Sequence, residues 1–271
     1  MTYFELQKQI EKSLKLENAD FIAKQILFSA LNCDSTDFIK IRNQTISEKI
    51  VEVAEKMAKK CNEGVPLYYV LGKCEFYSLP FLVGKGVLVP RNDTEILVDE
   101  ALKAIENKTN PKVLDLCSGS GAIAVAIAKN RPDSKVCAVE LYDEAFCYLQ
   151  KNISLNNANN VKAIKADALD FVGEYDLVVS NPPYISEAEK KDLAKQLFFE
   201  PEMALFADDD GLYFYKKIAE NFKNNNGFTL IFEIGYKMEK SVTEILKNNG
   251  YSCISAVKDY GNNTRVIKAK I

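Results

Sequence analysis

The chain has 271 residues, 47% of them hydrophobic, and carries 35 Lys and Arg against 38 Asp and Glu, for a net charge of -3. This balance gives no overall attraction to phosphate backbones or anionic membrane surfaces, which disfavours tight, sequence-indifferent binding of nucleic acid. No segment approaches the roughly 20 apolar residues needed to span a bilayer, and the first residues lack the basic-then-apolar layout of a signal peptide. We expect a cytoplasmic protein, monomeric by default, that binds neither nucleic acid nor membranes.

Histidine is absent, and the seven cysteines include no Cys-x-x-Cys pair. An odd number of scattered cysteines is typical of reduced thiols, and we interpret them as small core residues. The lack of imidazole excludes the usual general base, Ser-His-Asp catalysis and the usual imidazole-thiolate zinc sites. We expect chemistry that needs neither histidine nor a metal.

Residues 1–72 predict a small domain made only of helices. Thr2-x-x-Glu5 is a capping-box pattern ahead of an apolar helical series, and a second helix follows from about Asn18. Thr45-x-x-Glu48 repeats the pattern before an apolar stripe made of Ile46, Ile50, Val53, Ala54 and Met57. The pattern indicates a helical bundle without catalytic residues, which could bind a partner.

Residues 73–90 predict a β-hairpin connector, in which Gly84-Lys85-Gly86 turns the strand 73–83 back into Val87-Leu88-Val89. In residues 91–271, strand and helix patterns alternate, which indicates parallel strands with helices on both faces. The expected strands are 112–117, 135–140, 161–167, 175–180 and 228–234; the expected helices are 122–129, 143–155, 211–222 and 239–247. Strands 251–257 and 265–270 can close the chain as an antiparallel pair. The fold class is therefore α/β, with a Rossmann-like sheet.

A cofactor loop is predicted where the apolar strand 112–117 runs into a glycine turn and a helix start. Gly119 and Gly121 permit positive φ and leave room for a ligand over the end of the strand, while Glu140 ends the next strand and can accept hydrogen bonds from a ribose. The spacing also fits dinucleotide cofactors. Asp115 favours S-adenosylmethionine (AdoMet), because a carboxylate suits a sulfonium and an amino group but repels a pyrophosphate.

Asp167 and Ala168 end the third strand, where a carboxylate and the adjoining backbone can hold an adenine. An aspartate at a strand end is also a common turn former.

The most specific feature is Asn181-Pro182-Pro183-Tyr184, directly after an apolar strand. The two prolines stiffen the turn and present carbonyl acceptors without competing donors. Asn181 adds an acceptor and Tyr184 a flat ring, which together suit an NH2 group on a planar π system. We predict an AdoMet-dependent enzyme that methylates a planar nitrogen by positioning it, with no strong base.

Further motifs resemble the PrmC/HemK family, which methylates N5 of a glutamine in peptide chain release factors. These motifs span roughly residues 64 to 266 and comprise residues 64–72, 75–77, 89–95, Glu200-Pro201-x-x-Ala204-Leu205-Phe206, Asp210-Gly211-Leu212-x-Phe214-Tyr215, and 232–235. The resemblance implies a class I AdoMet-dependent methyltransferase fold in residues 91–271. It also implies that residues 1–72 form the substrate-recognition domain.

The resemblance further implies the substrate and the site residues. The partner is a class-1 release factor, whose Gly-Gly-Gln glutamine is held by Asn181, Pro182, Pro183 and Tyr184, and the cofactor product is S-adenosylhomocysteine. The residues implied to hold AdoMet are Cys117, Ser118, Gly119, Ser120, Gly121, Glu140, Asp167, Ala168 and Asn181. Glu140 stands where aspartate is more usual and Asn92 where a second proline often follows Arg91, but neither departure removes a needed group.

Two other substrate classes are alternatives. A glutamine methyltransferase of a ribosomal protein shares the Asn-Pro-Pro-Tyr loop, but the motifs at 76–77 and 91–95 favour the release-factor enzyme. A DNA adenine-N6 methyltransferase needs a basic groove and a means to hold a flipped base, and we find no Lys- or Arg-rich tract. A binding module without catalysis would leave the Asn-Pro-Pro-Tyr loop unused.

Overall fold

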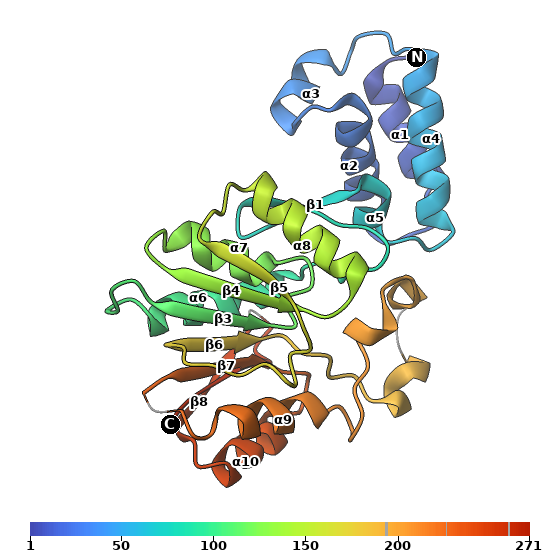
Figure 1. Ribbon diagram of the computed structural model, residues 1–271. Coiled ribbons are helices and arrows are strands. Elements are labelled where there is room, and N and C mark those ends of the chain that lie inside the picture. The colour runs from blue at the N-terminus through green and yellow to red at the C-terminus, as the bar shows by residue number, and fades with distance from the viewer. Residues whose placement is uncertain (193–194, 226, 260) are drawn as a thin grey trace. The chain divides into compact units, whose positions relative to one another are not determined.

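The computed structural model describes residues 1–192, 195–225, 227–259 and 261–271 (Figure 1). Contacts divide the chain into two compact units: Met1–Lys73 with Lys195–Phe199, and Cys74–Ala194 with Glu200–Ile271. Within the described residues, no helix combines the length and the apolar character needed to cross a membrane.

The first unit is helical. Its elements are α1 (Tyr3–Ser13), α2 (Ala19–Leu31), α3 (Ser35–Ile41), α4 (Glu48–Asn62), α5 (Leu67–Leu71) and the 3-10 segment η3 (Lys195–Phe199). The capping box at the start of α1 is confirmed: the Thr2 amide donates to Glu5 Oε2 at 2.8 Å and the Glu5 amide to Thr2 Oγ1 at 3.2 Å. The core of the unit consists of Leu6, Ile10, Leu14, Ala23, Ile26, Leu27, Phe38, Ala54, Ala58 and Cys61.

The second predicted capping box, at Thr45, is wrong. Thr45 instead forms a bridge with Thr2, and the Ile46 amide donates to the Met1 carbonyl, so these residues are extended alongside the N-terminus. Helix α4 therefore begins at Glu48 after Ser47, which makes no side-chain cap bond. Of the predicted stripe, Ala54 is buried and Ile46 and Met57 pack against the core in part, while Ala58 and Cys61 extend the buried face toward the C-terminus.

The hairpin exists, but its predicted turn is wrong. Strands β1 (Lys73–Phe76) and β2 (Leu79–Leu82) are joined by Tyr77 and Ser78, which adopt φ of 52° and 58°. Two central residues with positive φ match the twist of a tight hairpin, a conformation that usually favours glycine or asparagine. Here tertiary contacts hold it, because the Tyr77 amide donates to Glu95 Oε1 and its hydroxyl to Asp99 Oδ1, both at 2.7 Å. Residues 87–89 form no strand.

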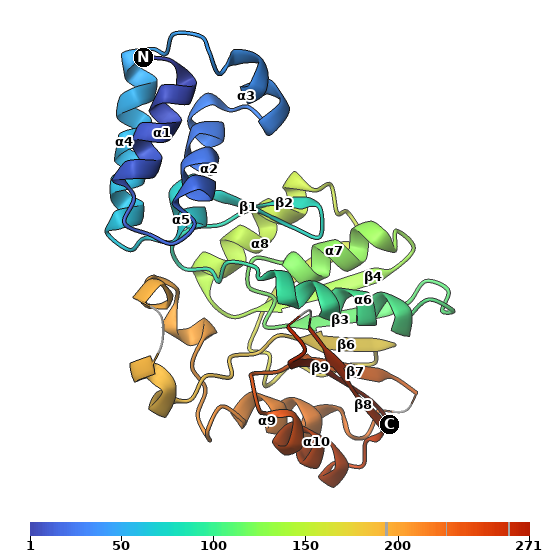
Figure 2. The ribbon, with the colours of Figure 1, turned by 180° about the vertical axis from the view of Figure 1, so that it is seen from behind.

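The second unit contains a seven-stranded sheet of order β5-β4-β3-β6-β7-β9-β8 (Figures 1 and 2). The strands are β3 (Lys112–Leu116), β4 (Lys135–Glu140), β5 (Val161–Lys165), β6 (Leu177–Ser180), β7 (Thr229–Glu233), β8 (Ser252–Lys258) and β9 (Thr264–Lys270). Strands β3 to β7 are parallel and β8 and β9 are antiparallel, as predicted. Strand β9 also pairs antiparallel with β7, which was not predicted. The order reverses between β3 and β6, where an open α/β sheet leaves a crevice at its carboxyl edge.

The helices of this unit are α6 (Glu95–Ala104), α7 (Ala122–Asn130), α8 (Asp143–Leu155), α9 (Tyr213–Phe222) and α10 (Glu239–Asn248), with 3-10 segments η1 (Asn92–Thr94), η2 (Glu187–Asp192) and η4 (Glu202–Ala204). Helices α9 and α10 pack together beside β7 to β9 (Figure 2). One core cluster joins them to Leu114 and Leu116 of β3. Because side chains alternate along a strand, Val113 and Asp115 point to the opposite face, where α7 contacts β3.

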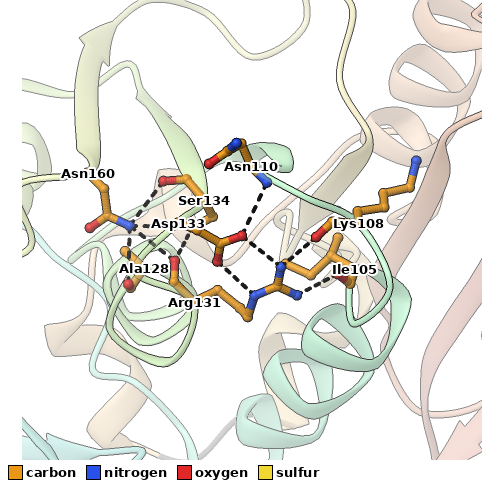
Figure 3. Close-up of polar contacts among 8 residues, drawn as sticks. All are labelled: Ile105, Lys108, Asn110, Ala128, Arg131, Asp133, Ser134 and Asn160. Carbon is orange, nitrogen blue, oxygen red and sulfur yellow. Dashed lines mark hydrogen bonds and ion pairs between the residues drawn. The ribbon is translucent and has the colours of Figure 1, made fainter.

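A polar cluster around Arg131 fastens the loops that follow α6 and α7 (Figure 3). The Arg131 guanidinium donates to the carbonyls of Ile105 and Lys108, which end α6 and its loop, and pairs with Asp133 at 3.0 Å. The Asn160 side chain donates from Nδ2 to the Ala128 carbonyl near the end of α7 at 3.1 Å. These bonds satisfy helix-terminal carbonyls and fix the loop that precedes β4.

Candidate active site

A cavity of about 260 Å³ lies at the carboxyl ends of the central parallel strands. It brings together residues that follow four strands: the loop after β3, the end of β4, and the segments after β5 and β6. The predicted site residues that line it are Cys117, Ser118, Gly119, Ser120, Glu140, Asp167, Ala168, Asn181 and Pro183. Asp115, Gly121, Pro182 and Tyr184 lie outside its lining. This placement at the switch point is typical of a ligand site in an open α/β sheet.

The loop after β3 is bent sharply over the strand. Cys117 adopts φ 61°, which costs a residue with a Cβ about 1–2 kcal/mol. Gly119 has φ 54°, and a Cβ there would meet no atom within 4 Å. Gly121 has φ 82°, but its Cβ would lie 2.5 Å from Leu149 Cδ1 of α8. The missing side chain of Gly121 therefore lets α7 and α8 pack, and the structure gives no evidence that it makes room for a cofactor.

Asp115 lies in β3 beneath this loop and is fully buried. Among the described residues, no hydrogen-bond donor meets either of its carboxylate oxygens. Burial raises its pKa to about 7; the nearby Ser118 hydroxyl and Ala124 amide oppose that rise, and the charge of Glu140 adds to it. A buried carboxylate is costly when ionised, and positive charge on a ligand in the cavity above the loop would offset part of that cost.

Glu140 ends β4 and holds two backbone amides. Its Oε2 accepts from the Gly119 amide at 2.8 Å and its Oε1 from the Tyr142 amide at 2.9 Å. Burial raises its pKa, while these two bonds lower it. Each carboxylate oxygen has further acceptor capacity, so the side chain can fix the glycine loop and still face a ribose.

Asp167 lies two residues beyond the end of β5 and lines the cavity. Its Oδ1 accepts from the Leu169 amide at 2.9 Å. Asp167 therefore stabilises a turn, which is the common role of an aspartate at a strand end. Ala168 is buried beside it.

The segment after β6 is held in place by hydrogen bonds to neighbouring elements. The buried Ser180 hydroxyl donates to the Leu116 carbonyl at 2.8 Å, which ties the end of β6 to the end of β3. The half-buried Asn181 side chain donates from Nδ2 to Thr94 Oγ1 at 3.5 Å. Pro183 lines the cavity, whereas Pro182 is buried outside its lining.

Tyr184 points away from the position that the sequence suggested. A Cβ at Gly235 would lie 2.8 Å from Tyr184 Cδ2, so the ring packs directly against that glycine. Burial raises the Tyr184 pKa to about 12, with the charge of Glu233 adding to the rise. The ring supports the loop from the core side, and in this structure it is not a wall of the cavity.

The cavity also includes residues that sequence reasoning did not assign to the site: Leu88, Arg91, Thr94, Tyr142, Pro201, Met203 and Phe214. Several of these residues fall in the family motifs at 89–95 and 200–215, which could have predicted their place in the site. No motif in the sequence includes Tyr142. Glu200 joins two of the runs, since its Oε2 accepts from the Val89 amide at 3.2 Å and its Oε1 pairs with Arg91.

Comparisons with known proteins identify the family. The Methyltransferase small domain model matches residues 92–213. The Release factor glutamine methyltransferase of Fusobacterium nucleatum is 38% identical, covering 99% of this chain and 83% of the relative, and that of Shewanella oneidensis is 33% identical, covering 96% and 92%. This chain belongs to the release factor glutamine methyltransferase family. It is therefore a methyltransferase, and its family and fold imply AdoMet as the cofactor.

Solved structures support the fold of this methyltransferase. The hMettl16 catalytic domain, in a crystal structure with the MAT2A 3'UTR hairpin 6, matches with a TM-score of 0.62 and covers 72% of this chain and 76% of that chain. At 16% identity, the likeness concerns the fold alone.

The residues present fit AdoMet. Net positive charge on the cofactor complements two buried carboxylates, Asp115 and Glu140, of which Asp115 has no hydrogen-bond partner within the described parts of the chain. The open space at Gly119 leaves room against the backbone. Both features are expected of a methyltransferase whose cofactor carries a sulfonium and an amino group.

Proposed function

We propose that this chain transfers a methyl group from AdoMet to N5, the side-chain amide nitrogen, of the Gly-Gly-Gln glutamine in class-1 peptide chain release factors. One observation carries the proposal: a single cavity joins the loop Cys117–Ser120 and Glu140 to Asn181 and Pro183. The names of relatives that share a third or more of their residues with nearly the whole chain support the substrate class.

The residues after β6 supply the groups that an amide nitrogen needs. Such a nitrogen delocalises its lone pair and is a weak nucleophile, so its orientation must contribute much of the rate. Asn181 Oδ1 and the Pro182 carbonyl are acceptors for the two hydrogens of the substrate NH2. They hold the nitrogen in line and stabilise the positive charge that develops on it. The proton leaves afterwards, when the nitrogen is far more acidic, so no strong base is required.

The cofactor is held by residues from three strand ends. Glu140 is assigned to the ribose, Asp167 and Ala168 to the adenine, and the loop 117–121 with Asp115 beneath it to the amino acid part. AdoMet supplies an electrophilic methyl group when bound. We assign residues 1–72 to recognition of the release factor and infer a monomeric enzyme that needs no metal. Since its partner acts in translation, we place the reaction in the cytoplasm.

Mass spectrometry of the substrate tests this function. Unmodified release factor, ribosomal proteins and adenine-containing DNA are incubated separately with the protein and AdoMet. We expect one methyl group on the Gly-Gly-Gln glutamine, and none on a release factor in which glutamate replaces that glutamine. Methylation of another substrate, with the release factor unchanged, would refute the assignment.

Three further measurements test the remaining inferences. Cross-linking to the release factor is expected to yield links from residues 1–72; links confined to 91–271 would contradict the recognition role. Activity is expected to survive a chelator, and light scattering is expected to give the mass of a single chain.

A further inference from the structure

Glu233 is a buried carboxylate beside the catalytic loop that the mechanism above does not use. It is the last residue of β7 and only 3% exposed. In the parallel register Ser180 pairs with Phe232, so Asn181 and Glu233 occupy the next positions of adjacent strands. Glu233 Oε2 is buried and has no hydrogen-bond partner in the described parts of the chain. An acceptor is therefore available next to the predicted substrate-binding asparagine.

Thr94 lies between these two side chains. It ends η1, is 4% exposed, and its hydroxyl oxygen accepts from Asn181 Nδ2 at 3.5 Å. The side chains of Thr94 and Asn181 both lie close enough to Glu233 to lower its pKa, although burial has the larger, opposite effect. Thr94, Asn181 and Glu233 thus come from three separate elements, η1, the β6 loop and β7.

The chemistry of this cluster selects one orientation of the Asn181 amide. An asparagine side chain presents two N–H donors on one side and a carbonyl acceptor on the other. A carboxylate can only accept, so an amide oxygen turned toward Glu233 would meet another oxygen without a hydrogen between them. The donating side of Asn181 therefore belongs against Thr94 and Glu233, and its oxygen against the cavity.

We propose that Glu233 and Thr94 are positioning residues that hold the Asn181 carbonyl oxygen toward the cavity, ready to accept from the substrate NH2. This inference rests on the proposed function, because it assigns Asn181 the task of binding a planar NH2 group. Glu233 touches neither substrate nor cofactor and acts through Asn181.

The protonation of Glu233 makes the cluster sensitive to pH. Burial raises the Glu233 pKa to about 7; Arg265 of β9 lowers it, and Asp93 of η1 raises it. Arg265 is shared with Asp259 and Asp93, at 3.1 and 3.3 Å. The neighbouring phenols of Tyr184 and Tyr215 are neutral near pH 7, because burial raises both of their pKa values. Above about pH 7 Glu233 only accepts, whereas below it the carboxylic acid can donate and tolerates a flipped amide.

Steady-state kinetics on the release factor test the proposal with matched variants. Glu233→Gln keeps the shape but adds a donor, and Thr94→Val keeps the shape but removes the hydroxyl. Each is expected to lower kcat about tenfold or more while the Kd for AdoMet stays within about twofold. Thr94→Ser, which keeps the hydroxyl, should lower kcat less than Thr94→Val does. Thr229→Val makes the same change at a buried site at the other end of β7 and should leave kcat unchanged.

A double-mutant cycle separates positioning from general damage to the fold. If Glu233 acts through Asn181, Glu233→Gln has no further effect on kcat in the Asn181→Ala background. If Glu233→Gln lowers kcat equally in wild type and in Asn181→Ala, the proposal is overturned. It is also overturned if Glu233→Gln and Thr94→Val both have the kcat of wild type. In wild type, kcat should fall as the pH drops through about 7, and Glu233→Gln should remove this dependence.

Nuclear magnetic resonance provides a test that needs no substrate, so failure of the substrate assignment remains distinguishable. The Asn181 side-chain NH2 signals, assigned with Asn181→Asp, are expected to shift with an apparent pKa near 7. Glu233→Gln should abolish that titration. Signals that do not titrate in wild type, or that titrate equally in Glu233→Gln, would overturn the inference even if the release factor is methylated.

Discussion

Asp115→Asn is expected to change the pH dependence of stability. In wild type, burial raises the pKa of Asp115 from 3.8 to about 7. The native state therefore binds the proton more tightly than the unfolded state, and stability falls as the pH rises from about 4 to about 7. Each pKa unit corresponds to about 1.4 kcal/mol, so the ionised side chain costs about 4 kcal/mol above pH 7.

Asparagine does not titrate, so the variant lacks this loss. Between about pH 5 and about pH 8, the unfolding free energy of Asp115→Asn should gain about 2–3 kcal/mol relative to wild type, because roughly two pH units of the titration lie in that interval. Urea unfolding followed by circular dichroism at both pH values measures the gain. Carboxylates with lowered pKa values, such as Glu100 and Asp176, contribute equally to the pH dependence of stability in wild type and in Asp115→Asn. Their contributions therefore cancel in the difference between the two proteins.

Ligand binding supplies the control. A cationic cofactor stabilises the ionised form of Asp115, so AdoMet binding to wild type near pH 7 should release protons, and the affinity should weaken as the pH falls below about 7. Calorimetry in buffers of different ionisation enthalpy detects this release, which Asp115→Asn should diminish. An identical stability difference at both pH values would show that Asp115 is already ionised in the native protein and would refute the reasoning.

Substitutions at three other positions test the site and the loops that support it. Asn181→Ala should lower turnover by about 10²-fold while circular dichroism shows an intact fold, since its half-buried side chain contributes hydrogen bonds rather than core packing; near-normal turnover would remove its role. Glu140→Ala should weaken AdoMet binding measured by calorimetry, because the amides of Gly119 and Tyr142 lose their acceptor, and Glu140→Gln should weaken it less; equal affinity would place the ribose contact elsewhere. Arg131→Ala should lower the unfolding free energy by about 1–3 kcal/mol without changing kcat, and a loss of kcat at unchanged stability would contradict its purely structural role.

Local patterns in the sequence predicted much of the fold. The strand 135–140 and the helix 143–155 match β4 and α8 to the residue, because each has its own apolar periodicity and clear boundaries. The closing antiparallel pair was also predicted from its two apolar runs and the loop between them.

The errors fall where a distant segment competes with a local signal. Thr45 has the spacing of a capping box but pairs with Thr2 instead. The glycines at 84 and 86 resemble a hairpin turn, yet the turn lies at Tyr77, which Glu95 and Asp99 hold in place. Propensity alone cannot identify these partners, because they are 18 to 43 residues away in the chain.

The sequence by itself determined the class of chemistry. Three local motifs indicated it: a glycine turn after a strand, a carboxylate that ends the next strand, and Asn181 followed by two prolines. Each motif consists of neighbouring residues, so it can be recognised in the sequence alone. Tertiary structure alone decided how side chains around these motifs are used. It places the Tyr184 ring against Gly235 and Glu233 beside Asn181, because strand order and register, which long-range packing sets, determine which strand ends become neighbours.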